Sequence, residues 1–190
     1  MPRATIKYIE EEMVRKISMG DQNAFKGLFH LYYKRLCRFA FLILHSKEQS
    51  EEAVSDVFIN VWIKREQLVP ECNIRSFLFT VVRNQAINYN QRANPIHSQD
   101  NINIYELEIE NPEPLADEVI DRALFRERLQ KAFEELPERC RLIARMHFSD
   151  QMPYKEIAEI LHISPITVKT QITIATHKIK DIFEKHGWNK

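Results

Sequence analysis

The fold is indicated most clearly by YKEIAEILHISPITVKTQI, residues 154–172. Two apolar patterns of helical period lie in this stretch, separated by a break at residues 162–164. Ser164 suits an N-cap and Pro165 suits the first helical position, so a second helix is predicted to begin there. Ala158 is small enough for two helices to cross closely. The spacing therefore predicts a helix-turn-helix, whose second helix would enter the major groove of DNA.

This predicted motif has an inner and an outer set of residues. The inner set is apolar and expected to be buried: Ile157, Leu161, Ile163, Val168 and Ile172. The outer set is polar and consists of Ser164, Thr167, Lys169, Thr170, Gln171 and Thr173. Lysine suits phosphate or guanine, glutamine suits adenine, and threonine methyl groups suit thymine. The alternative is an ordinary solvated helix face. His162 stands where glycine is usual and is expected to take a left-handed conformation.

The rest of the chain has the same helical period. A first helix carrying Met13 and Ile17 is expected to stop at Gly20. Further helices are predicted to begin at the capping residues Asp21 and Asn73. Another is predicted to open after Ser50, since Glu51 and Glu52 would complement the positive end of a helix in its first turn. In the second half, helices are predicted over residues 121–136, from residue 137, and over residues 154–161 and 165–185. No strand-like alternation or hairpin turn occurs, so the predicted fold class is all-α.

Several aromatic and apolar side chains of the first half are expected to serve only as core. Val57, Phe58 and Trp62 fall on the apolar stripe of one predicted helix. For Phe77 and Phe79 of the next predicted helix, core packing is favoured over contact with a nucleic acid. These residues are therefore not counted among the candidate site residues.

Composition excludes several classes of protein. The chain has 190 residues and only 3 glycines, too few for a glycine-rich phosphate loop. It has no apolar run long enough to cross a bilayer, so no direct membrane insertion is expected, and its start does not resemble a signal peptide. The 3 cysteines are widely spaced, which fits a reduced cytoplasm and neither disulfides nor a zinc site. We expect a cytoplasmic protein without a metal or cofactor.

The formal net charge of +0 hides an uneven distribution of charge. Residues 1–92 carry a net charge of +4, and residues 121–190 carry +3. Residues 93–120 contain 7 acidic residues, no Lys or Arg, and three prolines. We interpret the chain as two small helical domains, 10–92 and 121–186, joined by an acidic linker at 93–120. Its 28 residues would reach roughly 90 Å when fully extended.

Three segments of the first half carry a family resemblance, together with the helix-turn-helix. FKGLFHLYY, residues 25–33, resembles the opening helix of bacterial sigma factors. EEAVSDVFINVW, residues 51–62, resembles their polymerase-binding helix, and IRSFLFTVVRNQAINY, residues 74–89, their promoter-melting helix. LPER, residues 136–139, and the helix-turn-helix resemble sigma region 4. Two such blocks with only a linker between them are similar to the extracytoplasmic-function (ECF) group.

This resemblance implies a mechanism and a set of site residues. A sigma factor binds RNA polymerase core and directs it to two elements of promoter DNA, the minus-ten and the minus-thirty-five element. The implied polymerase contacts are Glu52, Ser55, Asp56 and Asn60. The implied melting residues are Arg75, Arg83, Asn84, Asn88, Tyr89 and Arg92, and loop 66–73 would hold a flipped base. Unstacked bases require such positive charge and apolar pockets. Ser55 replaces the family's common glutamine.

The resemblance also implies a cognate anti-sigma factor as partner and no small-molecule substrate. Three other classes of protein remain open at this point. A stand-alone helix-turn-helix regulator would use its first half for sensing or for partner binding. An enzyme would need a catalytic motif, whereas the histidines are scattered and no paired cysteines or clustered carboxylates occur. A helical adaptor would leave Ser164-Pro165 and the outer set of the predicted motif without a purpose.

Overall fold

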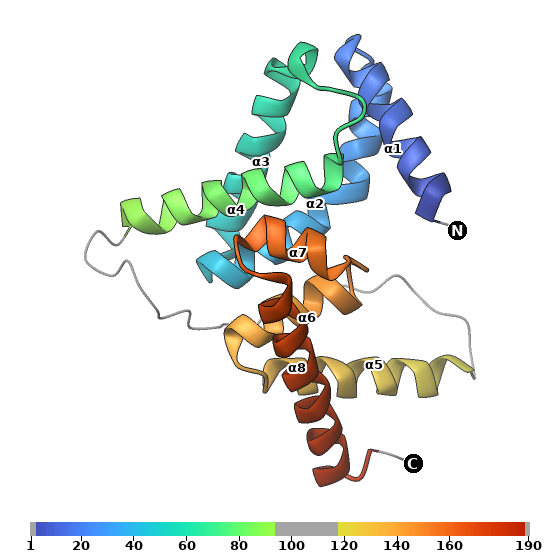
Figure 1. Ribbon diagram of the computed structural model, residues 1–190, viewed down its shortest axis with the longest axis vertical. Helices are drawn as coiled ribbons and strands as arrows, with labels where there is room; N and C mark the ends of the chain where they lie inside the picture. The colour runs from blue at the N-terminus through green and yellow to red at the C-terminus, as the bar shows by residue number, and fades with distance from the viewer. Residues whose placement is uncertain (1–2, 94–117, 189–190) are drawn as a thin grey trace. The chain divides into compact units, whose positions relative to one another are not determined.

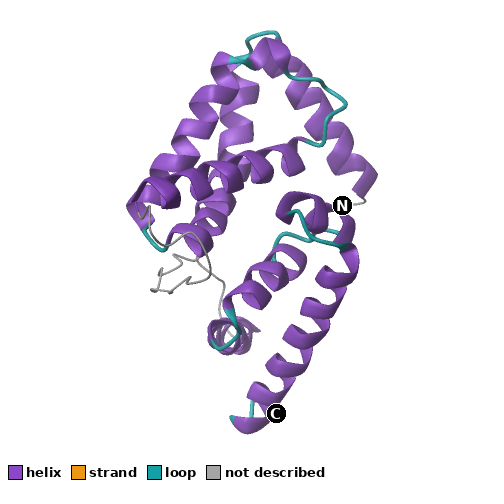
Figure 2. Ribbon diagram, turned by 60° about the vertical axis from the view of Figure 1, so that its left-hand side comes forward, coloured by secondary structure: helices purple, strands orange, loops and turns teal. Residues whose placement is uncertain are grey.

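The computed structural model describes residues 3–93 and 118–188, and these consist of helices joined by short loops (Figures 1 and 2). The prediction of an all-α fold is confirmed for these two ranges, which contain no strand. The chain divides into two compact units, Met1–Tyr105 and Glu106–Lys190. The acidic linker predicted at residues 93–120 lies outside the described residues except at its two ends.

The first unit is built around α2 (Gln22–Leu44), which packs against α1 (Arg3–Ser18), α3 (Lys47–Ile63) and α4 (Ile74–Ala93) (Figure 1). Leu28, Tyr32 and Leu36 of α2 recur at every fourth position and are almost completely buried. Tyr32 donates a short hydrogen bond to a Glu10 carboxylate oxygen, which links α2 to α1. Burial and this carboxylate together raise the pKa of Tyr32. One long helix thus supplies the centre of the unit.

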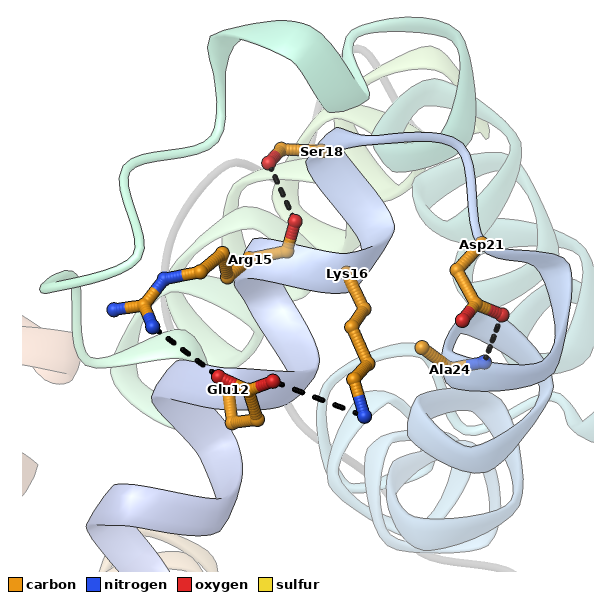
Figure 3. A network of polar contacts seen from close by, with 6 residues as sticks. All are labelled: Glu12, Arg15, Lys16, Ser18, Asp21 and Ala24. Atoms are coloured by element: carbon orange, nitrogen blue, oxygen red, sulfur yellow. Dashed lines mark hydrogen bonds and ion pairs between the residues drawn. The ribbon is translucent and has the colours of Figure 1, made fainter.

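The corner between α1 and α2 is held by local polar contacts (Figure 3). Asp21 caps α2, as predicted, because its carboxylate accepts hydrogen bonds from the Asn23 N–H at 2.8 Å and the Ala24 N–H at 3.0 Å. Gly20 has a φ of +88°, which L side chains rarely adopt, and this explains why α1 ends just before it. Exposed ion pairs of Glu12 with Arg15 and Lys16 add little stability.

The predicted start of the third helix after Ser50 is wrong. Helix α3 begins at Lys47, and its N-cap is Ser46, whose Oγ accepts from the Gln49 N–H at 3.3 Å. Ser50 lies one turn further along the helix, is 1% exposed, and donates its hydroxyl proton to the Ser46 carbonyl at 2.6 Å. Both serines suit a cap, and only the packing of Ser50 inside the unit distinguishes them.

The core assignments for the first unit are mostly, but not entirely, confirmed. Val57 and Phe58 are buried, and Phe79 is fully buried with its ring centroid 5.0 Å from that of Phe39. Phe77 is 39% exposed, so its assignment to the core is wrong. Helix α4 turns the face of Ile74, Leu78 and Val82 inward, and this rotation carries residue 77 toward the edge. Trp62 is half-buried, under the Arg65 guanidinium at 4.9 Å.

The second unit is built around α8 (Pro165–Lys185), which contacts α5 (Glu118–Glu134), α6 (Glu138–Phe148) and α7 (Tyr154–Leu161). Its core includes Phe133, Leu136, Cys140 and Ala175. The buried Arg141 donates from Nη2 to the carbonyl oxygens of Leu136, at 2.8 Å, and Glu134. These bonds satisfy the carbonyl group of the last residue of α5, which has no partner within the helix, and one in the turn that follows it.

His162 ends α7 in the left-handed conformation that was predicted, with φ 54° and ψ 45°. Glycine adopts this conformation without the steric cost that a Cβ atom brings.

We expect His162→Gly to stabilise the second unit by about 0.5 kcal/mol, after the entropy of the more flexible unfolded chain is subtracted. Hydrogen exchange of the α7 and α8 amide groups measures this unit separately. His162→Ala keeps the Cβ atom and is the control. Equal protection in both variants would contradict the expectation.

Candidate nucleic-acid interface

The turn between α7 and α8 has the geometry of a helix-turn-helix. Ala158 is 4% exposed at the helix crossing, and its carbonyl accepts from the Ile163 N–H at 3.0 Å. The Ser164 Oγ accepts from the Thr167 N–H at 3.0 Å, which confirms the predicted cap of α8. Within the predicted inner set Ile157, Val168 and Ile172 are buried, whereas Leu161 and Ile163 are only half-buried. The two less buried residues flank the turn, where less of the protein covers them.

One face of α8 is buried, and the opposite face is open to solvent. Val168, Ile172 and Ala175 form the buried face. Lys169, Thr170 and Thr173 are exposed, as expected for the outer set. Thr167 and Gln171 are half-buried, and the Thr167 hydroxyl lies 2.8 Å from the Ser164 Oγ. The second helix therefore presents a continuous surface at its N-terminal half, where such motifs contact base edges.

Helix α4 carries the predicted melting residues. Its N-cap is Asn73, as predicted, since the Asn73 Oδ1 accepts from the Ser76 N–H at 3.1 Å. Arg75 and Arg83 are half-buried, and Asn84 and Asn88 are exposed. The Arg83 guanidinium donates to the Asn84 Oδ1 at 3.3 Å, and burial lowers the pKa of Arg83. The side chain of Arg92 lies outside the described residues.

Two predicted site residues bind each other. The Tyr89 hydroxyl of α4 donates to the Asp56 Oδ2 of α3 at 2.9 Å, and the Gln85 Nε2 lies 3.5 Å from the same oxygen. Asp56 was predicted as a polymerase contact and Tyr89 as a melting residue. The structure makes both part of the joint between the two helices. Of the other predicted contacts on α3, Glu52 and Asn60 are exposed, and Ser55 donates to the Glu51 carbonyl at 2.7 Å.

Two family models match the chain, one in each unit. The model for "Sigma-70 region 2" matches residues 28–95, and the model for "Sigma-70, region 4" matches residues 126–175. The chain belongs to the sigma-70 family. Region 2 thus includes α3 and α4, and region 4 includes the helix-turn-helix up to Ala175 of α8.

The curated relatives that align with most of this chain include sigma factors of the ECF group. The ECF RNA polymerase sigma factor SigW of Bacillus subtilis is 20% identical over 169 residues, which is 85% of this chain and 90% of the relative. The ECF RNA polymerase sigma factor RpoE of Cereibacter sphaeroides is 23% identical over 171 residues, which is 84% of this chain and 86% of the relative.

Solved structures share the fold. CnrH, solved in complex with the cytosolic domain of CnrY, is 17% identical with a TM-score of 0.60, covering 93% of this chain and 98% of the other. The sigma factor RpoE of Bartonella quintana, solved in complex with the anti-sigma factor NepR, is 19% identical with a TM-score of 0.60. That likeness covers 84% of this chain and 96% of the other.

Sequence reasoning missed two exposed apolar side chains on region 2. Ile59 is 57% exposed and Ile63 is 64% exposed, one turn apart on α3. Glu52, Asp56, Ile59 and Ile63 recur at the spacing of one helix face. A signal was present, because both isoleucines lie off the stripe of Val54, Val57 and Val61 that packs into the core. Exposed apolar side chains beside polar ones are typical of a protein-binding face.

The loop at residues 66–73 of region 2 exposes the side chain at its centre to solvent. It begins with the short 3-10 helix η1 (Arg65–Gln67), and Val69 is 57% exposed. The Cys72 N–H donates to the Val69 carbonyl at 3.0 Å, which closes a tight turn. Burial raises the pKa of the Cys72 thiol, so this thiol is mostly protonated at neutral pH. The loop therefore exposes one large apolar side chain, Val69, among polar ones, and no reactive thiolate.

The described residues provide no group of three or more His, Cys, Asp or Glu placed to hold a metal ion. Cys37, Cys72 and Cys140 are all free thiols. None of the helices within residues 3–93 and 118–188 combines the length and apolar composition that crossing a bilayer requires.

The hydrogen bond between Asp56 and Tyr89 should stabilise region 2. We expect Tyr89→Phe and Asp56→Ala each to lower the free energy of unfolding by about 1 kcal/mol, a value discounted because both groups are partly solvated. Combined, they should cost little more than either change alone, because both remove the same bond. Urea denaturation of the four proteins measures the coupling. Asn88→Ala on the same helix is the control and should change stability by less than about 0.5 kcal/mol. Fully additive effects would contradict a direct bond.

Proposed function

We propose that this chain is an ECF sigma factor that binds RNA polymerase core and directs promoter-specific initiation of transcription. The observation that carries the proposal is the presence, in one chain, of region 2 and of a region 4 whose α8 has a solvent-facing side. Such a subunit binds and positions other molecules and is not itself an enzyme. It works where the polymerase and the promoter are, in the cytoplasm.

The polymerase contact belongs to α3. Glu52 and Asn60 are exposed on this helix, and Ile59 and Ile63 add apolar area that is otherwise solvated. A face that combines charge with exposed isoleucines suits a stable protein partner, because apolar burial supplies affinity and charge supplies orientation. Ser55 and Asp56 are bonded within the chain, so they would contribute less unless those bonds open.

Recognition and opening of the minus-ten element belong to α4 and to the loop that precedes it. Arg75 and Arg83 supply positive charge along the helix, while Asn84 and Asn88 supply exposed amides. Val69 of the loop and the partly exposed ring of Phe77 lie near the beginning of α4 in the sequence and offer apolar surface for an unstacked base. Single-stranded DNA is held by this combination of charge and stacking or apolar surface. Tyr89 and Arg92 complete the proposed set.

The minus-thirty-five element is the proposed ligand of α8. Ser164, Thr167 and Lys169 lie in the first turns of the helix, where helix-turn-helix proteins contact bases and phosphates. Thr170, Gln171 and Thr173 continue this set along the helix. A cognate anti-sigma factor is the proposed regulator, supported by the likeness in fold to the sigma factor that was solved with the anti-sigma factor NepR. No small-molecule substrate is needed for any of these steps.

The function is tested by adding the full chain to core polymerase on a random promoter library. We expect transcripts that begin downstream of a shared pair of sequence elements, and permanganate-reactive thymines near their start sites that mark opened DNA. Polymerase core alone is the control. Absence of such transcripts, with duplex binding by the free chain intact, would instead identify a stand-alone regulator.

The pair Lys169 and Gln171 tests the role of α8. We expect Lys169→Ala combined with Gln171→Ala to weaken holoenzyme binding to the minus-thirty-five element by about tenfold, since a base or phosphate contact contributes about 1–3 kcal/mol. Core association in a pull-down should be unchanged, because α8 lies in the other unit from α3. Lys185→Ala, at the far end of α8, is the matched control. An equal loss of core binding would refute a role limited to DNA.

A further inference from the structure

Among the large apolar side chains of α8, the most exposed is Ile166, which does not belong to the polar outer set predicted from the sequence. Ile166 is 77% exposed and follows Pro165 in the first turn of the helix. Scattered exposed apolar residues are common on protein surfaces and need no explanation by themselves. The first turn of a recognition helix is, however, the part that faces base edges. What surrounds Ile166 therefore determines whether it has a partner.

Ile166 shares its face of α8 with a small set of residues. Lys169, Thr170 and Thr173 follow it at the i+3, i+4 and i+7 positions, which lie above one another on a helix. All four side chains are exposed. Val168 and Ile172 on the opposite side are buried in the core. Their burial fixes how α8 is rotated about its axis and keeps the face of Ile166 turned to solvent.

The hydroxyl groups of the two threonines on this face donate to backbone carbonyl groups of α8. The Thr170 Oγ1 donates to the Ile166 carbonyl at 3.0 Å, and the Thr173 Oγ1 donates to the Lys169 carbonyl at 3.1 Å. A hydroxyl bonded in this way has no proton left for a base, although its oxygen still accepts. Each threonine therefore presents a γ-methyl group and an acceptor, and no donor.

Charge on the same stretch is equally sparse. Lys169 is the single charged residue between positions 165 and 176, and no arginine occurs there to bind guanine in a bidentate manner. The exposed face thus consists of one ammonium group, two hydroxyl oxygens that can only accept, and several aliphatic groups. Among the four bases, thymine is the one that presents an apolar group, its 5-methyl, in the major groove.

We infer that Ile166, together with the methyl groups of Thr170 and Thr173, recognises thymine 5-methyl groups in the minus-thirty-five element. This inference rests on the proposed function, in which α8 enters the major groove. Ile166 is then a specificity-determining residue. The helix would recognise the apolar methyl edge of thymine as a principal feature, rather than a hydrogen-bonding edge.

The test replaces thymines of the selected minus-thirty-five element one at a time by deoxyuridine. This change removes the 5-methyl group and keeps every hydrogen-bonding group of the base. Binding of reconstituted holoenzyme, made with the full chain, is measured on each duplex. We expect at least one position to lose about fourfold in affinity, the value for burying one methyl group. Ile166→Ala should bind the thymine duplex about fourfold or more weakly, and at one or more of the sensitive positions it should bind the thymine and deoxyuridine duplexes equally.

Two further variants separate recognition from general effects. Ile166→Val should keep part of the discrimination, and Ile9→Ala, which removes an exposed isoleucine from the other unit, should keep all of it. Equal binding of thymine and deoxyuridine duplexes by the unaltered holoenzyme would overturn the inference and leave the proposed function standing. A loss that persists undiminished at every sensitive position in Ile166→Ala would also overturn it. Failure to select any upstream element would overturn the proposed function, and the inference with it.

Discussion

Burial of one face of a long central helix is the constraint on which each unit depends. In region 2 this helix is α2, and Leu28, Tyr32 and Leu36 are removed from water along one stripe. In region 4 it is α8, through Val168, Ile172 and Ala175. Apolar burial at roughly 25 cal/mol per Å² opposes any rotation of these helices that would expose the stripe. For α8 the rotation also sets which side chains are available to DNA, so one packing interaction serves both stability and recognition.

The polar side chains of the candidate interfaces are bonded within the protein more often than their sequence suggests. Asp56 and Tyr89 join α3 to α4, Ser55 bonds its own helix, and the threonines of α8 bond to helix carbonyl groups. When the hydrogen-bond donors of a helix surface bond to the helix itself, mainly methyl groups and a few charged groups remain available to a partner. We therefore expect contact with DNA to be weak for the isolated chain, because few phosphate contacts are available, and to depend on attachment to core polymerase.

Helix caps and turn conformations were predictable from the sequence, because they depend on residues that are neighbours in the chain. Asp21, Asn73 and Ser164 were identified as caps because a capping side chain bonds to amides two or three residues away. The left-handed His162 was predictable because it stands at the turn position where glycine is usual. The start of α3 was misplaced because Glu51 and Glu52 suit a first turn, whereas the cap is Ser46 and Ser50 is buried within the helix. Phe77 was misassigned because its helix is apolar on several sides, so the pattern did not show which side faces inward.

The all-helical class, the helix-turn-helix and its register follow from the sequence alone, because periodicity and capping act over a few residues. The candidate sites were predictable as segments but not as surfaces. Exposure of Ile59 and Ile63, the partly exposed ring of Phe77 and the outward position of Ile166 arise from the way helices pack against one another. The bond between Asp56 and Tyr89 joins residues 33 positions apart. Such relations depend on how each helix is rotated by burial of its apolar face, and that rotation exists only once the helices have packed.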